Sequence, residues 1–303
     1  MSALAFLFIA GATWFIPVNA FGTNGEGNSR TLLVDTDFKP RLGKYYYNVN
    51  FNNVNIGNAT IIIDREGELY KVQVNAQSVG MIDSLYKLRY KGEATMGTDP
   101  LSSVEMKTQQ EVKSKEKDLT IKFQDNGSIR SVEKKSENGN TAKYDVRNVQ
   151  TDRYTIDPFT ATYLVRGLDW KVGVEKVFDV YPGKYQYELR LKCESLVTIN
   201  SNGQKRKAWV IIPKVTHLDP QKRAEALKKK PTSSKIYVSA DELKDVLKFE
   251  ASHTLGFFRV IMIRFDPAVE APKEVAPTSR EVNSPAGQGD VKNKNGDVPN
   301  KKD

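Results

Sequence analysis

Histidines and nearby carboxylates are the first side chains to consider for catalysis or metal binding, and this chain has only two histidines. His217 and Asp219 lie two positions apart in THLDP, so on a strand they would share one face. A metal site needs a third ligand, and His253 is distant in the sequence. Ser252 precedes His253 directly, and adjacent strand residues point to opposite faces. The positions of these residues therefore indicate a strand end followed by a turn, and not a catalytic or metal site.

Cys193 is the single cysteine, so it forms no internal disulfide. Its segment, YQYELRLKCESLVTI, alternates apolar and charged residues, which predicts a strand with Cys193 on the apolar face. We therefore expect a small buried side chain and not a nucleophile. The sequence contains neither GxxxxGK[ST] nor GxGxxG, the glycine-rich loops that hold phosphates. No catalytic residue, cofactor or metal is predicted.

The charge balance is basic, with 46 Lys and Arg against 37 Asp and Glu and a net charge of +9. Such a balance favours an anionic partner without choosing between headgroups, acidic glycans and nucleic acid. The sharpest basic cluster is Lys228, Lys229 and Lys230, at the end of the helix-like stretch DPQKRAEALKKKP. This cluster is either a solvated helix face or a peripheral contact with an anionic membrane surface. Because basic and aromatic residues do not alternate on one exposed face, nucleic acid is not predicted as a partner.

Both ends of the chain differ from its middle. Residues 2–17 are mainly apolar and precede VNA at 18–20, which predicts a signal peptide (1–20) cut after Ala20. No Lys or Arg precedes the apolar run, so the alternative is that this segment is not cleaved and remains as a membrane anchor. We expect export to the periplasm or outer envelope of a Gram-negative bacterium. Residues 21–39 and the polar tail 267–303 are predicted to be disordered, which leaves one folded domain, 40–266.

Between 40 and 266 the dominant hydrophobic period is two, as in KYYYNVNF and GELYKVQVNAQ. Asn, Gly and Asp separate these runs, and DNG and ENG are strong hairpin signals. A dozen or more strands should curl or close and not stay flat. The sequence therefore predicts a mainly β fold: a large antiparallel curved sheet or partly open barrel with one or two short helices.

One segment, DPFTATYLVRG at 157–167, interrupts this pattern. Asp157 is suited to cap a helix whose first residue is Pro158, and Gly167 is suited to end it. We expect a helix of about three turns that plugs the open end of the barrel or closes a sheet edge. Arg166 is expected to meet a carboxylate inside, and the buried positions are expected to be Phe159, Tyr163 and Leu164.

The segments GKYYY at 43–47, NIGNA at 55–59, DPFTATYLVR at 157–166, SKIYVSADEL at 234–243 and LG at 255–256 occur in this order. Together they resemble the exported bacterial family named domain of unknown function 3108, over about 40–266. Where that family usually has Trp, this chain has Tyr237, which keeps an aromatic surface. The resemblance implies an exported β protein of unassigned role, with some members loosely linked to polysaccharide export, and it transfers no catalytic residue. The motif positions, expected to be structural, are Gly43, Tyr45, Tyr47, Gly57, Asp157, Pro158, Tyr163, Arg166, Ser239, Asp241 and Gly256.

Three functions remain open at this stage. The first is a non-enzymatic protein of envelope biogenesis that binds a glycan, a lipid or another envelope protein. The second is a lipid or lipoprotein carrier with an apolar cavity. The third is a hydrolase whose dispersed site would include His217, Asp219 and His253. Alternating strands do not separate a filled barrel from a hollow one, because both bury the same faces.

Overall fold

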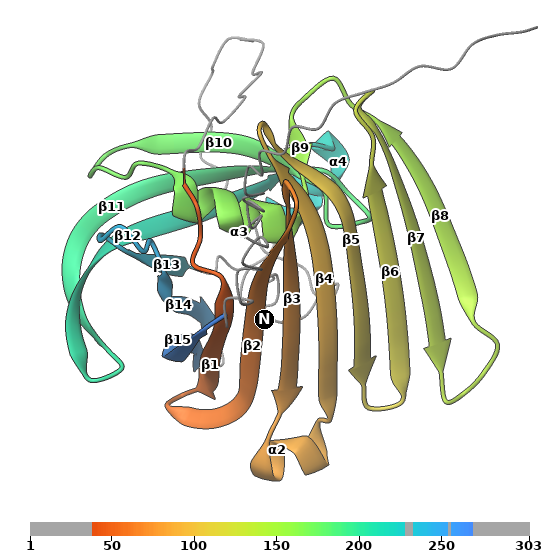
Figure 1. Ribbon diagram of the computed structural model, residues 1–303. Helices are drawn as coiled ribbons and strands as arrows, with labels where there is room; N and C mark the ends of the chain where they lie inside the picture. Colours follow the sequence, from red (N-terminus) through yellow and green to blue (C-terminus); the bar gives the residue numbers. More distant parts are fainter. Residues whose placement is uncertain (1–37, 228–232, 254–255, 269–303) are drawn as a thin grey trace, which may run out of the picture. The chain divides into compact units, whose positions relative to one another are not determined.

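Fifteen β-strands form one sheet in this computed structural model, which describes residues 38–227, 233–253 and 256–268 (Figure 1). All of these residues belong to one compact unit, Met1–Ala268. The first half of the sheet comprises β1 (Gly43–Phe51), β2 (Val54–Glu66), β3 (Leu69–Ser78), β4 (Leu88–Thr98), β5 (Leu101–Val112), β6 (Lys115–Phe123), β7 (Ser128–Glu137) and β8 (Lys143–Gln150). The second half comprises β9 (Thr155–Ile156), β10 (Glu175–Val180), β11 (Tyr187–Ser201), β12 (Gln204–His217), β13 (Ser234–Ser239), β14 (Val246–His253) and β15 (Gly256–Pro267).

The strands follow one another as a meander. From β1 to β8, each strand pairs with the next in antiparallel fashion, and β9 to β15 continue in the same way except that β9 and β10 are parallel. The first and last strands, β1 and β15, pair and join the two halves, so β8 and β9 are the two edges. The sheet curls but stays open, which confirms the predicted curved antiparallel sheet.

Side-chain alternation places the core on the concave face of the sheet. In β3 every second residue is buried, from Tyr70 to Ser78, and the residues between them are exposed. Neighbouring strands keep this phase, because Val74 pairs with Ile61 on one side and with Gly92 on the other. The period-two reading of the sequence therefore identified the core face correctly.

Three short helices occur in the described residues, where the sequence predicted one or two: α2 (Gly80–Leu85), α3 (Pro158–Gly167) and α4 (Pro220–Leu227). The unpredicted helix, α2, begins at Gly80, whose φ of +59° lies in the left-handed region. Its Asp83 accepts hydrogen bonds from Ser78 and Arg89 of the flanking strands, which fix this single turn. The predicted helix, α3, lies inside the curl of the sheet (Figure 1).

Several predictions fall outside the described residues. These are the signal peptide and most of the linker, residues 1–37, the lysine cluster Lys228–Lys230, and most of the polar tail, 269–303. Among the residues that the structure describes, no helix has the length and apolar character needed to cross a membrane.

Candidate functional site

The start of α3 is fixed by Asp157, as predicted. Its Oδ1 accepts hydrogen bonds from the backbone N–H groups of Phe159 (2.7 Å) and Thr160 (3.1 Å). Its Oδ2 accepts the hydroxyl proton of Ser103 from β5, so the helix start is tied to the sheet. Burial raises the pKa of Asp157, and these hydrogen bonds oppose that rise. Pro158 occupies the first helical position, where a missing N–H costs nothing.

The middle of α3 packs against β3 and β4. A Cβ on Gly92 would lie 2.6 Å from Cζ of Phe159, so β4 accepts the Phe159 ring only because position 92 has no side chain. Tyr163 lies between Phe38 and Tyr70, each with its ring centroid 5.7 Å away. Phe159 and Tyr163 are both buried, as expected. The role of Gly92 was missed, because only the fold brings β4 to the helix.

The end of α3 is held by a buried charge cluster around Asp245. Arg166 donates to the backbone carbonyls of Lys244 (2.9 Å) and Leu243 (3.2 Å) and lies 3.4 Å from Asp245 Oδ1. The side chains of Arg166 and Asp245 are 6% and 0% exposed. Asp245 also contacts Arg41 (2.6 Å) and Arg206 (3.2 Å). The expectation that Arg166 meets a carboxylate inside is thus met, although sequence reasoning did not identify Asp245.

Two motif residues, Ser239 and Asp241, shape the loop that carries Asp245. The hydroxyl of Ser239 donates to Asp241 (2.7 Å) and accepts from the backbone N–H of Asp245 (2.8 Å). Arg206 joins Asp241 (2.7 Å) and Asp245 from β12. Tyr45 accepts a hydrogen bond from Arg166 (3.2 Å). These motif positions therefore meet at one place, the contact between α3, β1 and the β13–β14 loop.

The motif glycines lie where a side chain would collide with backbone or a neighbouring residue. At Gly57 a Cβ would lie 2.7 Å from the Gln77 carbonyl oxygen. Gly256 has φ +149°, and a Cβ there would overlap the side chain of Asn52. Gly43, with φ +138°, is enclosed in the same way by the backbone of Asp266. A side chain at any of these positions would therefore displace a neighbouring strand or side chain.

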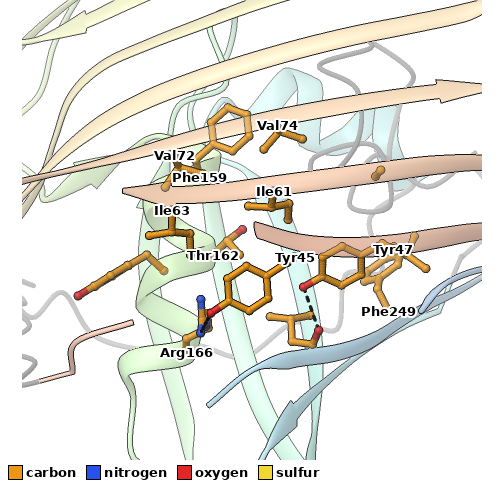
Figure 2. Close-up of a pocket in the computed structure, with 14 residues that line it drawn as sticks. Tyr45, Tyr47, Ile61, Ile63, Val72, Val74, Phe159, Thr162, Arg166 and Phe249 are labelled. Atoms are coloured by element: carbon orange, nitrogen blue, oxygen red, sulfur yellow. Dashed lines mark hydrogen bonds between the residues drawn. The ribbon is translucent and has the colours of Figure 1, made fainter. Parts of the chain in front are cut away.

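A cavity of about 50 Å³ remains between α3 and the sheet (Figure 2). Aliphatic and aromatic side chains of β1, β2, β3, β14 and β15 form most of its wall, and α3 forms the rest. The cavity is lined by Tyr45, Tyr47, Ala59, Ile61, Ile63, Val72, Val74, Phe159, Thr162, Tyr163, Arg166, Val246, Phe249 and Val260.

The hydroxyl groups of this wall already donate elsewhere. Tyr45 donates to the carbonyl of Arg41 and Tyr47 to that of Val246, each at 3.1 Å. Thr162 donates to the carbonyl of Pro158 (3.0 Å), and Tyr163 donates to that of Phe38. Burial raises the pKa of Tyr47 above its ordinary value, so this phenol stays neutral. The one charged side chain of the wall, Arg166, donates to Tyr45, Asp245 and two backbone carbonyls, so the rest of the cavity surface is mainly apolar.

The residues first considered for chemistry do not assemble. His217 is buried between the rings of Tyr185 (5.6 Å) and Tyr187 (4.3 Å). Asp219 caps α4 by accepting from the N–H groups of Gln221 and Lys222, while His253 is the last residue of β14. In the described part of the chain, no three His, Cys, Asp or Glu residues gather as metal ligands.

Cys193 lies within β11 and is completely buried, as the alternation predicted. Burial raises the pKa of its thiol. A buried thiol with a raised pKa is a poor nucleophile, because the thiolate is the reactive form.

Comparison with protein families identifies the chain. Residues 46–263 match the family described as "Protein of unknown function (DUF3108)". The chain belongs to the DUF3108 family. The match covers the sheet from β1 into β15, together with α3. A search of curated proteins found no match.

Solved structures resemble this DUF3108 chain at low identity. A β-barrel-like protein of domain of unknown function DUF1849 from Brucella abortus is 9% identical with a TM-score of 0.49, covering 75% of this chain and 98% of its own. A protein inferred to be exported, with a YmcC-like fold, from Bacteroides fragilis is 7% identical with a TM-score of 0.34, covering 77% and 99%. A protein inferred to be a lipoprotein from Parabacteroides distasonis is 8% identical with a TM-score of 0.30, covering 77% and 99%.

Proposed function

We propose that this DUF3108 protein is a non-enzymatic, exported binding protein of the cell envelope whose ligand places an apolar group in the cavity beside α3. The observation that carries the proposal is the chemistry of the cavity wall. Its aliphatic and aromatic side chains come from five strands and one helix, and its hydroxyl groups already donate to backbone carbonyls. Apolar pockets with few polar groups are the usual binding sites for apolar ligands.

The wall favours a lipid over a glycan. A sugar hydroxyl that enters a pocket without finding a hydrogen-bond partner loses about 1–3 kcal/mol of desolvation energy. Tyr45, Tyr47 and Thr162 have each committed their only donor. The end of an acyl chain needs no such partner and gains about 0.8 kcal/mol for each buried methylene.

The volume sets how much of a ligand fits. A cavity of about 150 Å³ admits benzene, whereas this one measures about 50 Å³. The site therefore fits the tip of an acyl chain, and deeper insertion requires Phe159 or the rest of α3 to move. A carrier that encloses a whole chain, the alternative function, requires that larger movement.

Two features support the proposed export and the proposed absence of catalysis. The apolar run at 2–17 with its small-residue site at 18–20 supports export to the periplasm or outer envelope of a Gram-negative bacterium. The structural settings of His217, Asp219 and Cys193 support a role without catalysis.

Binding of the fluorescent fatty acid cis-parinaric acid tests the proposal. We expect saturable binding by the wild-type protein and weaker binding by Val74→Phe, because Val74 lines the cavity. Val104→Phe is the matched control, since Val104 is exposed on β5 and does not line the cavity. Equal loss in both variants, or no saturable binding by the wild type, would contradict an acyl site here.

Mass spectrometry of protein purified from the periplasm tests the proposed signal cleavage and the proposed class of ligand. The denatured mass is expected to correspond to a chain that begins at Phe21, and a chain that keeps residues 1–20 would contradict cleavage. A lipid adduct on the native protein identifies the ligand class, whereas a glycan adduct would contradict the preference argued above.

A further inference from the structure

The β8 strand forms one edge of the sheet, and its outward backbone groups pair with no strand among the described residues (Figure 1). It pairs with β7 over eight residues without a register shift, and no described strand pairs with its outer side. It contains no proline, and its residues are exposed or half-buried. The other edge strand, β9, has only two residues. A regular edge of this length is a template for another strand.

The outward backbone groups of β8 follow from its pairing with β7. The N–H of Thr151 donates to the carbonyl of Gly127 (3.0 Å), and the register continues with Val149 opposite Ile129. In an antiparallel ladder every second residue bonds to the same neighbour. The odd-numbered residues of β8 therefore bond to β7. The free N–H and C=O groups belong to the even-numbered residues, Tyr144, Val146, Asn148 and Gln150.

We propose that β8 pairs antiparallel with β8 of a second copy of this chain, with the two Val146 residues opposite each other. This arrangement joins the two open sheets into one and satisfies the backbone groups of both edges. The partner is a second copy because the strand is complementary to itself in charge and in shape.

The charge pattern selects the register. Only two registers pair seven residues and also bring the free backbone groups face to face. One is centred on Val146 and sets Asp145 opposite Arg147 of the second copy, twice. The other is centred on Arg147 and sets the two guanidinium groups opposite each other, which is destabilising. The register centred on Val146 is therefore favoured.

The two faces of β8 support the same register. On the concave face, Asp145 contacts Arg147 of its own strand, so pairing creates a square in which each carboxylate lies beside two guanidinium groups. On the convex face, Val146 is 51% exposed and lies opposite Val132 of β7. Pairing places four valines in one row across the two copies. Tyr144, 66% exposed, comes to lie opposite Asn148 of the second copy.

Cysteine cross-linking measures this register in the full mature protein. Directly opposed residues have Cα atoms about 5.5 Å apart, within the range that a disulfide spans. We expect Val146→Cys to form a disulfide-linked dimer under mild oxidation. The control, Tyr144→Cys, stays monomeric on denaturing gels because its two copies lie about 13 Å apart along the strands. Cys193 is buried and does not compete. Equal cross-linking of both variants, or of neither, would overturn the proposal.

Charge reversal supplies an independent test by analytical ultracentrifugation. The wild type is expected at twice the monomer mass. Asp145→Arg and Arg147→Asp are each expected as monomers with an unchanged far-ultraviolet spectrum, because each places like charges opposite each other. Mixing the two variants restores opposite charges and is expected to restore the dimer. A monomeric wild type would mean that Lys143, Asp145 and Arg147 protect the edge from pairing and would overturn the proposal. Dimers of both single variants would overturn it too.

Discussion

Replacement of Arg166 by Met tests whether the motif around α3 serves the fold or chemistry. The substitution keeps an unbranched side chain that packs beside Phe38 and Tyr45, over whose rings the guanidinium lies at 5.3 and 5.2 Å. It removes the donors to the carbonyls of Leu243 and Lys244 and one of the charges beside Asp245. The loss is therefore a loss of polar partners more than of packing.

The magnitude follows from what remains buried. Two carbonyl groups lose their Arg166 donor, at about 1–3 kcal/mol for each group that stays unsatisfied. Breaking a buried ion pair usually costs about 3–5 kcal/mol because a charge is left alone. Here Asp245 keeps Arg41 and Arg206, so that full penalty does not apply. We expect a loss of about 2–4 kcal/mol, or about 5–15 °C in Tm for a domain of this size.

Urea denaturation followed by circular dichroism measures this loss, with two comparison variants. Asp245→Asn is expected to cost more than Arg166→Met, because it leaves Arg166, 6% exposed, without its carboxylate. Arg206→Met is expected to cost less, because Arg206 is 17% exposed and water replaces part of its interaction. An unfolding free energy for Arg166→Met within about 0.5 kcal/mol of the wild type would refute the structural role assigned to this residue.

Three further substitutions test other parts of the α3 contact and the sheet. Asp157→Ala removes the helix cap and is expected to lower the unfolding free energy by about 2 kcal/mol, measured by urea denaturation. Gly92→Ala is expected to cost about 1–3 kcal/mol by overpacking and to be partly rescued by Phe159→Leu in a double-mutant cycle. Burial of Glu133 raises the pKa of its carboxyl group. The ammonium groups of Lys117 and Lys135 outweigh this effect and hold the pKa below the ordinary value of about 4.3. Its stabilising contribution is present above that value and is lost as pH falls through the folded pKa, so Glu133→Gln should flatten the acid loss of stability.

The strands and turns were predictable because their signals are local. Alternation from Tyr70 to Ser78 fixes which face of β3 is buried, whatever lies beside it. The turn between β7 and β8 uses Asn138 and Gly139, both with positive φ, and these residue types mark such turns in any sequence. The cap at Asp157 is local in the same sense.

The α3 contact was only partly predictable because its residues are far apart in the sequence. Arg166 and Asp245 are 79 positions apart, and Arg41 is 204 positions from Asp245. No sequence feature near Asp245 distinguishes its carboxylate from the many others. Likewise, no sequence feature near Gly92 indicates that the Phe159 ring packs against it. The helix α2 was missed for a related reason, since its single turn is held by Ser78 and Arg89 of neighbouring strands and not by its own periodicity.

Strand number alone did not decide between a closed barrel and an open sheet. After β8 the chain turns into the two-residue β9, which pairs parallel with β10, and α3 then enters the concave side. A helix in that position occupies the space that a hollow barrel would leave to a ligand. The remaining 50 Å³ lies against α3 itself, so the helix is part of the wall that would have to move.

This geometry makes Arg166→Met a test of access as well as of stability. Arg166 joins α3 to the β13–β14 loop, and the cavity lies between that contact and Phe159. If movement of α3 admits an acyl chain, loosening this contact lowers the barrier to entry. We expect cis-parinaric acid to associate several-fold faster with Arg166→Met than with the wild type in stopped-flow fluorescence, under conditions where both are folded. Lys235→Met is a suitable control, because Lys235 pairs with Glu194 at the surface and does not contact α3. An unchanged association rate for Arg166→Met would mean that side chains such as Phe159, and not the helix, control entry to the cavity.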